Sequence, residues 1–293
     1  TNIEVLNELI DEHPIIPLII RYRKIQKLSS TYVEAYIDLV EKKGDIIHTV
    51  FNQTLTSTGR LSSSEPNLQN IPVRDEEGKA LRALFISRFT NGKIISADYN
   101  QIELRLMAHF SGDEKLVEAY REGKDIHTLT ASQVFGVPED EVTSVERRRA
   151  KAVNFGIIYG ISDYGLSQNI RLSRKEAKQY IEKYFETYSG VKEYMENNVK
   201  KARELGYAQT MFGRIRKVPE INSSNFTLRN FGERVAMNMP LQGTASDIIK
   251  KAMIKVFDKI NELKLKSKLI LQIHDELIVD TAEDEVEIIK KIL

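Results

Sequence analysis

Helical periodicity dominates the chain. In the first 43 residues it links Ile15, Ile19, Tyr22 and Ile25, and then Tyr32, Tyr36 and Leu39. Pro14 suits a helix start and Gly44 suits a helix end, so residues 1–43 are predicted to be helical. The pattern predicts nearly unbroken helix from Gln101 to about Tyr207, with interruptions at Gly112, Gly123, Gly136 to Pro138 and Gly160. Further helices are predicted from about Thr244 to Leu263 and from near Glu283 to the last residue.

Strand-like runs lie on both sides of this helical stretch. Residues 46–56 predict a strand, and the polar residues 57–67 predict a loop. A short buried strand is predicted over Lys93 to Tyr99. Gly206 to Pro219 predicts a hairpin with its turn at Gly213 and three basic residues at its tip, Arg214, Arg216 and Lys217. Two strands, 269–273 and 277–279, are joined through His274-Asp275-Glu276. The fold class predicted is α+β, with a helical subdomain inserted into a sheet domain.

Composition narrows the class of protein. Hydrophobic residues make up 41% of the 293 residues and charged residues 29%, which is typical of a globular protein. The net charge of +1 excludes a strongly basic coat, and the lack of cysteine excludes disulfides and thiolate metal sites. The apolar run 15–20 is too short to cross a bilayer and the start does not resemble a signal peptide, so we expect a soluble, intracellular chain with no membrane partner.

Acidic residues lie at the ends of two predicted strands. Asp98 ends one strand, and the pair Asp275-Glu276 lies at the tip of a hairpin 177 residues later (275 − 98). If folding brings them together, they form an oxygen-rich site suited to Mg²⁺. The alternative is that they are ordinary turn residues, since aspartate is common in turns.

A basic helix is predicted after Thr143, which forms a capping box with Glu146. The arginines and the lysine at 147–151 then face the positive end of the helix dipole, at a cost of about 0.3–1 kcal/mol per exposed charge. Such an arrangement favours binding of a polyanion such as a triphosphate. Every fourth residue along the helix forms one stripe, comprising Arg147, Lys151, Phe155 and Tyr159. The alternative is a solvated charged turn followed by aromatic core residues.

Asp125 and His127 allow two interpretations, a catalytic pair and an ordinary helix cap. An acid followed by an imidazole can take part in catalysis. At a helix start, however, Asp125 is more typical of an N-cap.

Several of these segments together resemble family A DNA polymerases. Asp98-Tyr99-Asn100-Gln101-Ile102-Glu103-Leu104-Arg105 resembles motif A, Arg147 through Gly160 resembles motif B, and His274-Asp275-Glu276 resembles motif C, in the family's order. Three further segments match it, at 58–63, 125–128 and 239–244. The resemblance covers essentially the whole chain and implies an antiparallel palm sheet flanked by helices, with a large inserted helical fingers subdomain.

The resemblance implies a role for each matched residue. Asp98, Asp275 and the backbone carbonyl of Tyr99 would bind two Mg²⁺ ions, and Glu276 would be an auxiliary catalytic acid. The nucleotide would be bound by Arg147, Lys151, Phe155, Tyr159, His127 and Glu103, of which Glu103 would exclude a ribose 2′-hydroxyl. DNA would be bound by Arg60, Gln242 and His274.

The resemblance also implies a division of the chain and its partners. A thumb-base remnant would occupy 1–43, the first part of the palm 44–120, the fingers 121–224, and a truncated second part of the palm 225–293. The partners would be primer–template DNA and a dNTP, and the protein would act as a monomer in a bacterial cytoplasm, in DNA replication and repair. Two alternatives are a catalytically impaired fragment that binds primer–template DNA, and a two-metal phosphodiesterase. The basic stripe argues against the phosphodiesterase.

Overall fold

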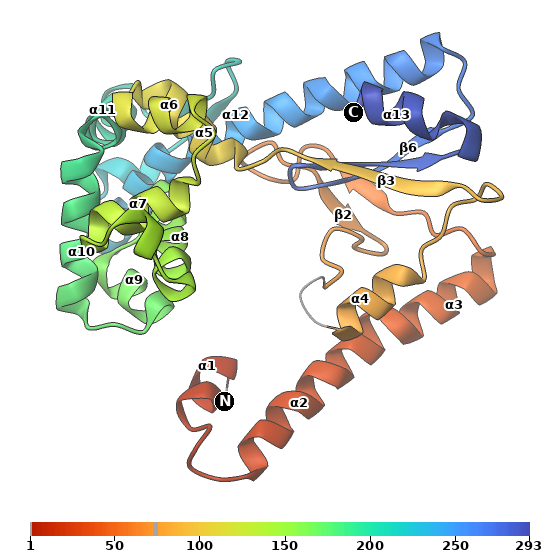
Figure 1. Ribbon diagram of the computed structural model, residues 1–293, viewed down its shortest axis with the longest axis horizontal. Coiled ribbons are helices and arrows are strands. Elements are labelled where there is room, and N and C mark those ends of the chain that lie inside the picture. The colour runs from red at the N-terminus through yellow and green to blue at the C-terminus, as the bar shows by residue number, and fades with distance from the viewer. Residues whose placement is uncertain (1, 73–75) are drawn as a thin grey trace.

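The computed structural model describes residues 2–72 and 76–293 of the protein. Residue 1 and residues 73–75, which fall in the expected ranges 1–43 and 44–120, lie outside the described residues. Figure 1 shows a block of helices on one side, a small sheet on the other, and one long helix that runs from the block over the sheet. The predicted α+β class is confirmed.

The chain begins with helices, as predicted. Their bounds are α1 (Ile3–Glu8), α2 (Ile15–Leu28), a π-helical turn η1 (Ser29–Val33) and α3 (Glu34–Lys43). Pro14 precedes α2, and Gly44 ends α3 with a φ of +88°. The apolar spacing in α2 does not mark a core face, because none of its residues is buried. Tyr32 and Tyr36 are buried in a core with Leu68, Ile71 and Leu81, and Leu28 and Leu39 pack against it.

A three-stranded antiparallel sheet carries the predicted acidic residues. Its strands are β3 (Lys93–Asp98), β6 (Lys268–Ile273) and β7 (Glu276–Thr281), in the order β3-β7-β6. The long helix α12 (Phe226–Glu262) and α13 (Val286–Ile292), which follows the short turn η4 (Glu283–Glu285), pack on one face through Ile249, Val256, Leu277, Val279 and Ile289. The prediction that β3 is buried was wrong, because β3 is an edge strand and Ile94 is 39% exposed.

The segment before the sheet is less regular than predicted. The strand predicted over 46–56 is only β1 (Val50–Asn52), and the predicted loop contains its partner β2 (Ser62–Ser64). The three serines of β2 have no apolar alternation, which is why the pattern did not indicate a strand. Helix α4 (Glu76–Ala83) follows.

The helical block has its own core. Its helices are α5 (Ile102–Ser111), α6 (Glu114–Arg121), α7 (Ile126–Phe135), η2 (Glu139–Glu141), α8 (Ser144–Ile158), α9 (Asp163–Ile170), α10 (Arg174–Thr187) and α11 (Ser189–Leu205). The predicted breaks at Gly112, Gly123, Gly136 and Gly160 coincide with positive φ angles. Leu104, Met107, Leu116, Val153 and Tyr184 are fully enclosed at the centre of the block.

A hairpin connects the block to the long helix. Strands β4 (Tyr207–Gln209) and β5 (Ile215–Lys217) pair as predicted, and η3 (Pro219–Asn222) leads into α12. Lys217 is not at the hairpin tip, because it pairs with Tyr207 at the open end. The predicted start of α12 near Thr244 was also wrong. The helix begins at Phe226 and continues through Pro240. No helix among residues 2–72 and 76–293 is long and apolar enough to cross a membrane.

Candidate active site

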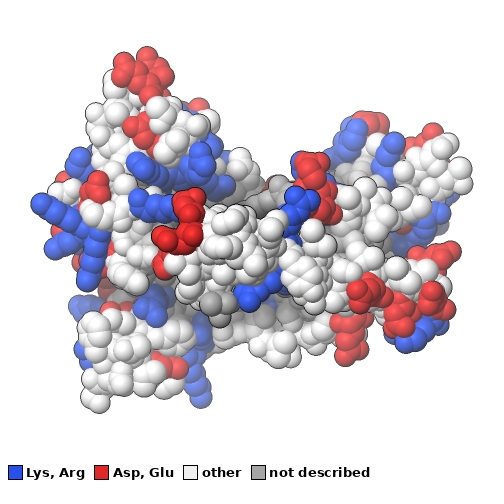
Figure 2. Space-filling model, turned by 90° about the horizontal axis from the view of Figure 1, so that it is seen from below, with Lys and Arg blue, Asp and Glu red and all other residues white. Residues whose placement is uncertain are grey.

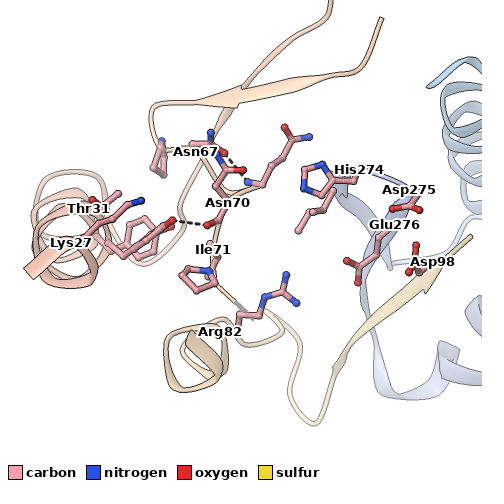
Figure 3. Close-up of a pocket in the computed structure, with 16 residues that line it drawn as sticks. Lys27, Thr31, Asn67, Asn70, Ile71, Arg82, Asp98, His274, Asp275 and Glu276 are labelled. Carbon is pink, nitrogen blue, oxygen red and sulfur yellow. Dashed lines mark hydrogen bonds between the residues drawn. The ribbon is translucent and has the colours of Figure 1, made fainter. Parts of the chain in front are cut away.

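The three predicted acids meet at one end of the sheet, where β3 ends and β7 begins. Asp98 is the last residue of β3 and lies opposite Glu276, the first residue of β7. The backbone N–H of Tyr99 donates to the carbonyl oxygen of Asp275 at 3.1 Å, and Asp275 lies near enough for its charge to raise the pKa of Asp98. Strand pairing therefore brings together carboxylates that are far apart in the sequence, as Figure 3 shows.

The acids repel one another. The pKa of Asp98 is raised, first by burial and then by the negative charges of Asp275 and Glu276. Such a rise means that the site favours either a proton or a cation between the carboxylates.

The turn that carries Asp275 is held tightly. His274 joins β6 to β7 with a φ of +53°, a left-handed conformation that is uncommon outside glycine. The Gln272 amide donates to the carbonyl oxygen of His274, and the Gln69 amide donates to that of Gln272 at 2.9 Å. This network fixes the turn, and with it the direction of the acids.

A cavity of about 960 Å³ opens beside the acids. His274 and the three acids form one wall. Lys27 of α2, Asn67 and Arg82 of α4 are among the residues of the opposite wall, and Arg82 extends toward the acids (Figure 3). Sequence reasoning missed Lys27 and Arg82, since neither belongs to a motif that indicates a site.

The predicted capping box at the start of α8 is present. Thr143 accepts a hydrogen bond from the backbone of Glu146, whose side chain bonds back to Thr143. Arg147 forms an ion pair with Asp125 at 2.5 Å, and both side chains are partly exposed. Burial alone would raise the pKa of Asp125. Hydrogen bonds from Arg147, Thr128 and the backbone N–H of His127 outweigh it and lower the pKa to about 2. Asp125 is thus the N-cap of α7, the simpler of its two sequence readings.

The aromatic part of the stripe is ordered. The Lys151 ammonium lies 5.9 Å from the centre of the Phe155 ring, and the Phe155 and Tyr159 rings are stacked at 6.5 Å. These three residues line a second cavity of about 740 Å³, which Arg148 and Arg234 also line. Arg234 was missed, although it lies eight residues before Gln242 and so close to the same face of α12. Figure 2 shows Lys and Arg side chains gathered at the left of the face it presents, on the side of the helical block.

Glu103 connects α8 to the sheet side of the site. It is only 6% exposed, it pairs with Arg60, and it accepts a hydrogen bond from the Tyr159 hydroxyl at 2.8 Å. Gln242 of α12 lies near the Tyr159 hydroxyl, where it acts to lower the pKa of that group. Burial, followed by the charge of Glu103 and its hydrogen bond, raises the pKa of Tyr159 to about 12. Four residues predicted from separate motifs therefore form one cluster.

The loop before Arg60 rests on an ion pair whose carboxylate is buried and whose guanidinium is partly exposed. The Arg214 guanidinium donates to Asp247 at 2.7 and 2.9 Å, and Thr210 donates to the same carboxylate at 2.8 Å. Gly59 has a φ of +80°, and a Cβ atom there would lie 2.5 Å from Nε of Arg214. Neither Arg214 nor Asp247 was predicted to support the site, because only the folded chain brings them under this loop.

Gly59→Ala is expected to destabilise the chain by about 1–3 kcal/mol, because the held Arg214 side chain must move as well as the backbone. Urea unfolding measures this change. Gly44→Ala is the matched control, since Gly44 has a φ of +88° and open space around its Cβ position. It is expected to cost about 1 kcal/mol or less. Equal losses in the two variants would show that the Arg214 contact contributes nothing.

The site formed by Asp98 and Asp275 suits a cation that keeps part of its coordination shell from water or substrate. The described residues contain no group of three or more His, Cys, Asp or Glu side chains arranged to bind a metal ion. Mg²⁺ is commonly bound by one or two carboxylates together with waters and substrate phosphates. The facing Asp98 and Asp275 fit that requirement, and their mutual repulsion is what a cation would relieve.

Comparison with known sequences gives a consistent match. A sequence profile of DNA polymerase family A matches residues 1–293. DNA polymerase I of Bacillus subtilis (strain 168) is 53% identical over 293 residues, and that of Geobacillus stearothermophilus is 52% identical over 287 residues. These alignments cover 100% and 98% of this chain, but 33% of each relative. The chain thus spans about a third of the length of the curated relatives that it matches.

A solved structure has the same fold. It is the POL domain of Pol1 from M. smegmatis, in complex with DNA primer-template and dNTP. The TM-score is 0.94 at 44% sequence identity, and the match covers 100% of this chain and 52% of the other.

Proposed function

This chain belongs to DNA polymerase family A, and we propose on that basis that it carries out template-directed DNA synthesis. It adds a nucleotide from a dNTP to a primer 3′-hydroxyl and releases pyrophosphate. The observation that carries the proposal is that Asp98 and Asp275, which are far apart in the sequence, line the same cavity. The basic and aromatic stripe of α8 lines a second cavity of the same chain.

The acids have the chemistry that the reaction needs. Asp98, Asp275 and the Tyr99 carbonyl would bind two Mg²⁺ ions, whose chemistry when bound is to make the primer hydroxyl more acidic and to neutralise the leaving group. Glu276, opposite Asp98, adds negative charge to the same end of the sheet. The family match supports divalent metal ions, and the choice of two Mg²⁺ ions is part of the proposal.

The nucleotide would bind along α8. Lys151, Arg147 and His127 would bind the triphosphate, Phe155 would pack on the sugar, and Tyr159 would stack at the templating position. Because Arg147 is paired with Asp125, binding a phosphate would require it to exchange partners or to bridge both anions.

Glu103 would exclude ribonucleotides from the same position. It is held by Arg60 and Tyr159, so its carboxylate is fixed rather than free to move aside. Arg60 and Gln242 would contact the minor groove of the last base pair, where acceptors occupy similar positions in every correct pair. His274, which lines the cavity beside the acids, would contact the primer terminus.

The proposed division of the chain follows from these roles. Residues 1–43 would form the thumb base, 44–120 and 225–293 the palm, and 121–224 the fingers. The last boundary falls at Asn225, the N-cap of α12. We propose a monomer in a bacterial cytoplasm that acts on primer–template DNA in replication and repair.

Primer extension by the 293-residue chain tests the proposal. With labelled dNTP and Mg²⁺, the primer is expected to lengthen opposite template bases, and EDTA is expected to stop it. Binding of primer–template without extension would favour the alternative of a catalytically impaired binding fragment. Cleavage of single-stranded DNA with Mg²⁺ would instead favour the phosphodiesterase.

Phe155→Tyr is expected to increase incorporation of dideoxynucleotides. A ring that contacts the sugar and lacks a hydroxyl cannot replace the hydrogen bond of a missing 3′-hydroxyl, whereas tyrosine can. The ratio of kcat/KM for ddTTP to that for dTTP measures the change, which we expect to be about tenfold or more. Phe185→Tyr, on α10, is the matched control. An unchanged ratio in Phe155→Tyr would contradict contact with the sugar.

A further inference from the structure

Four buried polar side chains form a continuous series of hydrogen bonds between α7, α8 and the segment that joins α10 to α11. Tyr188 and Thr130 are 0% exposed, Asn154 is 1% and His127 is 2%. The Tyr188 and Thr130 hydroxyls lie 3.3 Å apart, the Thr130 hydroxyl is 3.2 Å from Oδ1 of Asn154, and Nδ2 of Asn154 is 3.0 Å from Nδ1 of His127. These hydrogen bonds link Tyr188, which lies between α10 and α11, to residues of α7 and α8.

Tyr188 sets the direction of these hydrogen bonds. Among the described residues its hydroxyl has Thr130 as its only hydrogen-bond partner, so its proton must go to Thr130. Thr130 then donates to Oδ1 of Asn154, and the amide group of Asn154 donates to Nδ1 of His127. The reverse direction would leave the buried Tyr188 proton without an acceptor, which is unfavourable in a site that excludes water. Nδ1 of His127 is therefore an acceptor, and the ring proton lies on Nε2.

The surroundings of His127 favour the neutral ring. Burial lowers its pKa to about 4, against the charge of Asp125, and Arg147 and Lys151 lower it further. Asp125 is the cap of its own helix, and the two bases come from α8. Nε2 has no hydrogen-bond partner among the described residues. It is also not one of their polar atoms that are both fully buried and without a partner, so Nε2 keeps some contact with solvent.

We propose that Asn154 is a positioning residue that holds His127 as a neutral Nε2–H donor to a phosphate oxygen of the incoming dNTP. The inference rests on the proposed function, because the phosphate is that of the polymerase substrate. The opposite tautomer would present a lone pair to the anion and repel it. Arg147 and Lys151 supply charge, while His127 supplies a directed hydrogen bond that does not depend on pH near neutrality.

Imidazole nitrogen NMR of the ¹⁵N-histidine-labelled chain tests the tautomer without any activity. The chain has five histidines, and the loss of signal in His127→Gln assigns the one that matters. We expect a protonated Nε2 and an unprotonated Nδ1 from about pH 6 to pH 8. A protonated Nδ1 in the parent would overturn the inference. Thr130→Ser, which keeps the hydroxyl, is expected to keep the Nε2–H tautomer.

Asn154→Asp tests the consequence for substrate. Aspartate only accepts hydrogen bonds, so Nδ1 must then carry the proton, and at about pH 9 the neutral ring turns a lone pair outward. Equilibrium binding of dATP to the chain on a dideoxy-terminated primer–template is expected to weaken about tenfold at that pH and less at about pH 6, where the ring is charged. Asn197→Asp, an exposed site on α11, is the matched control and is expected to change affinity less than about twofold.

The outcomes separate this inference from the proposed function. If the parent binds dATP and shows the Nε2–H tautomer but does not extend a primer, the inference holds and the proposed catalysis fails. If Asn154→Asp reverses the tautomer without weakening dATP binding, or if the parent does not bind dATP, the inference fails.

Discussion

Asp98→Asn is expected to abolish primer extension, with a loss of about 10³-fold or more in kcat. The substitution preserves shape but removes one of the two facing carboxylates, so the negative site that would attract a divalent cation is halved. A 10³-fold loss corresponds to about 4 kcal/mol of transition-state stabilisation, which is within the range of metal-assisted charge stabilisation. Single-turnover extension measures the rate, and gel-shift binding of primer–template is expected to change little.

In the absence of metal, Asp98→Asn is also expected to change how the free energy of unfolding depends on pH. Because the pKa of Asp98 is raised in the folded chain, the native state binds this proton more readily than the unfolded state does. The charge at Asp98 therefore destabilises the fold above the raised pKa, and the penalty disappears as the pH falls through it. Asp98→Asn is expected to be at least as stable as the parent at about pH 7, with the advantage shrinking in acid. Asp258→Asn, on the exposed face of α12, is the control. Full extension activity in Asp98→Asn would refute the proposed chemistry.

Lys151→Met is expected to raise the KM for dNTP by about 10–100-fold, with a smaller change in binding of primer–template. The lysine side chain is exposed and lies against the Phe155 ring, so its ammonium is directed rather than buried in a structural pair. A hydrogen bond from a charged group contributes about 1.5–3 kcal/mol, which corresponds to that range of affinity. Steady-state kinetics over a dNTP titration measure KM and kcat separately.

The control for this prediction lies in the same block. Lys183→Met, on the exposed face of α10, removes the same charge away from both cavities and is expected to leave KM within about twofold. The effect of Lys151→Met should also weaken as salt is raised, because added ions screen a solvent-accessible charge. A KM equal in the two variants would exclude Lys151 from triphosphate binding.

Part of the site could be predicted from residues alone. Asp98 and Asp275 stand out because they lie next to apolar runs of strand length, but their meeting depends on the antiparallel pairing of β3 with β7, which the pattern left open. Glu103, Arg60 and Gln242 were identified by resemblance to a family, not by their spacing. Their convergence on Tyr159 depends on how α5, α8 and α12 pack. The roles assigned to all of these residues remain predictions.

Other features could not be predicted because they depend on distant partners. Arg82 and Lys27 become part of the site only when α4 and α2 form the wall opposite the acids. Arg214 has the sequence context of a hairpin tip, yet its charge is neutralised by Asp247 on another element. In the fold, the helix predicted from about Thr244 begins at Phe226, and α12 continues through Pro240 because its neighbours Met239 and Leu241 are each packed in a core.

That continuity has a mechanical consequence. At 1.5 Å per residue α12 is a strut about 55 Å long, shared by the helical block and the sheet, and Gln242 lies near its middle. Because Pro240 has no backbone N–H, α12 lacks one of its main-chain hydrogen bonds there. Any rotation of the helical block relative to the sheet would therefore bend the helix next to Gln242, the residue proposed to contact the base pair. Hydrogen exchange should then find the turn around Pro240 less protected than the turns around Ile249, and uniform protection along the helix would argue for a rigid bar.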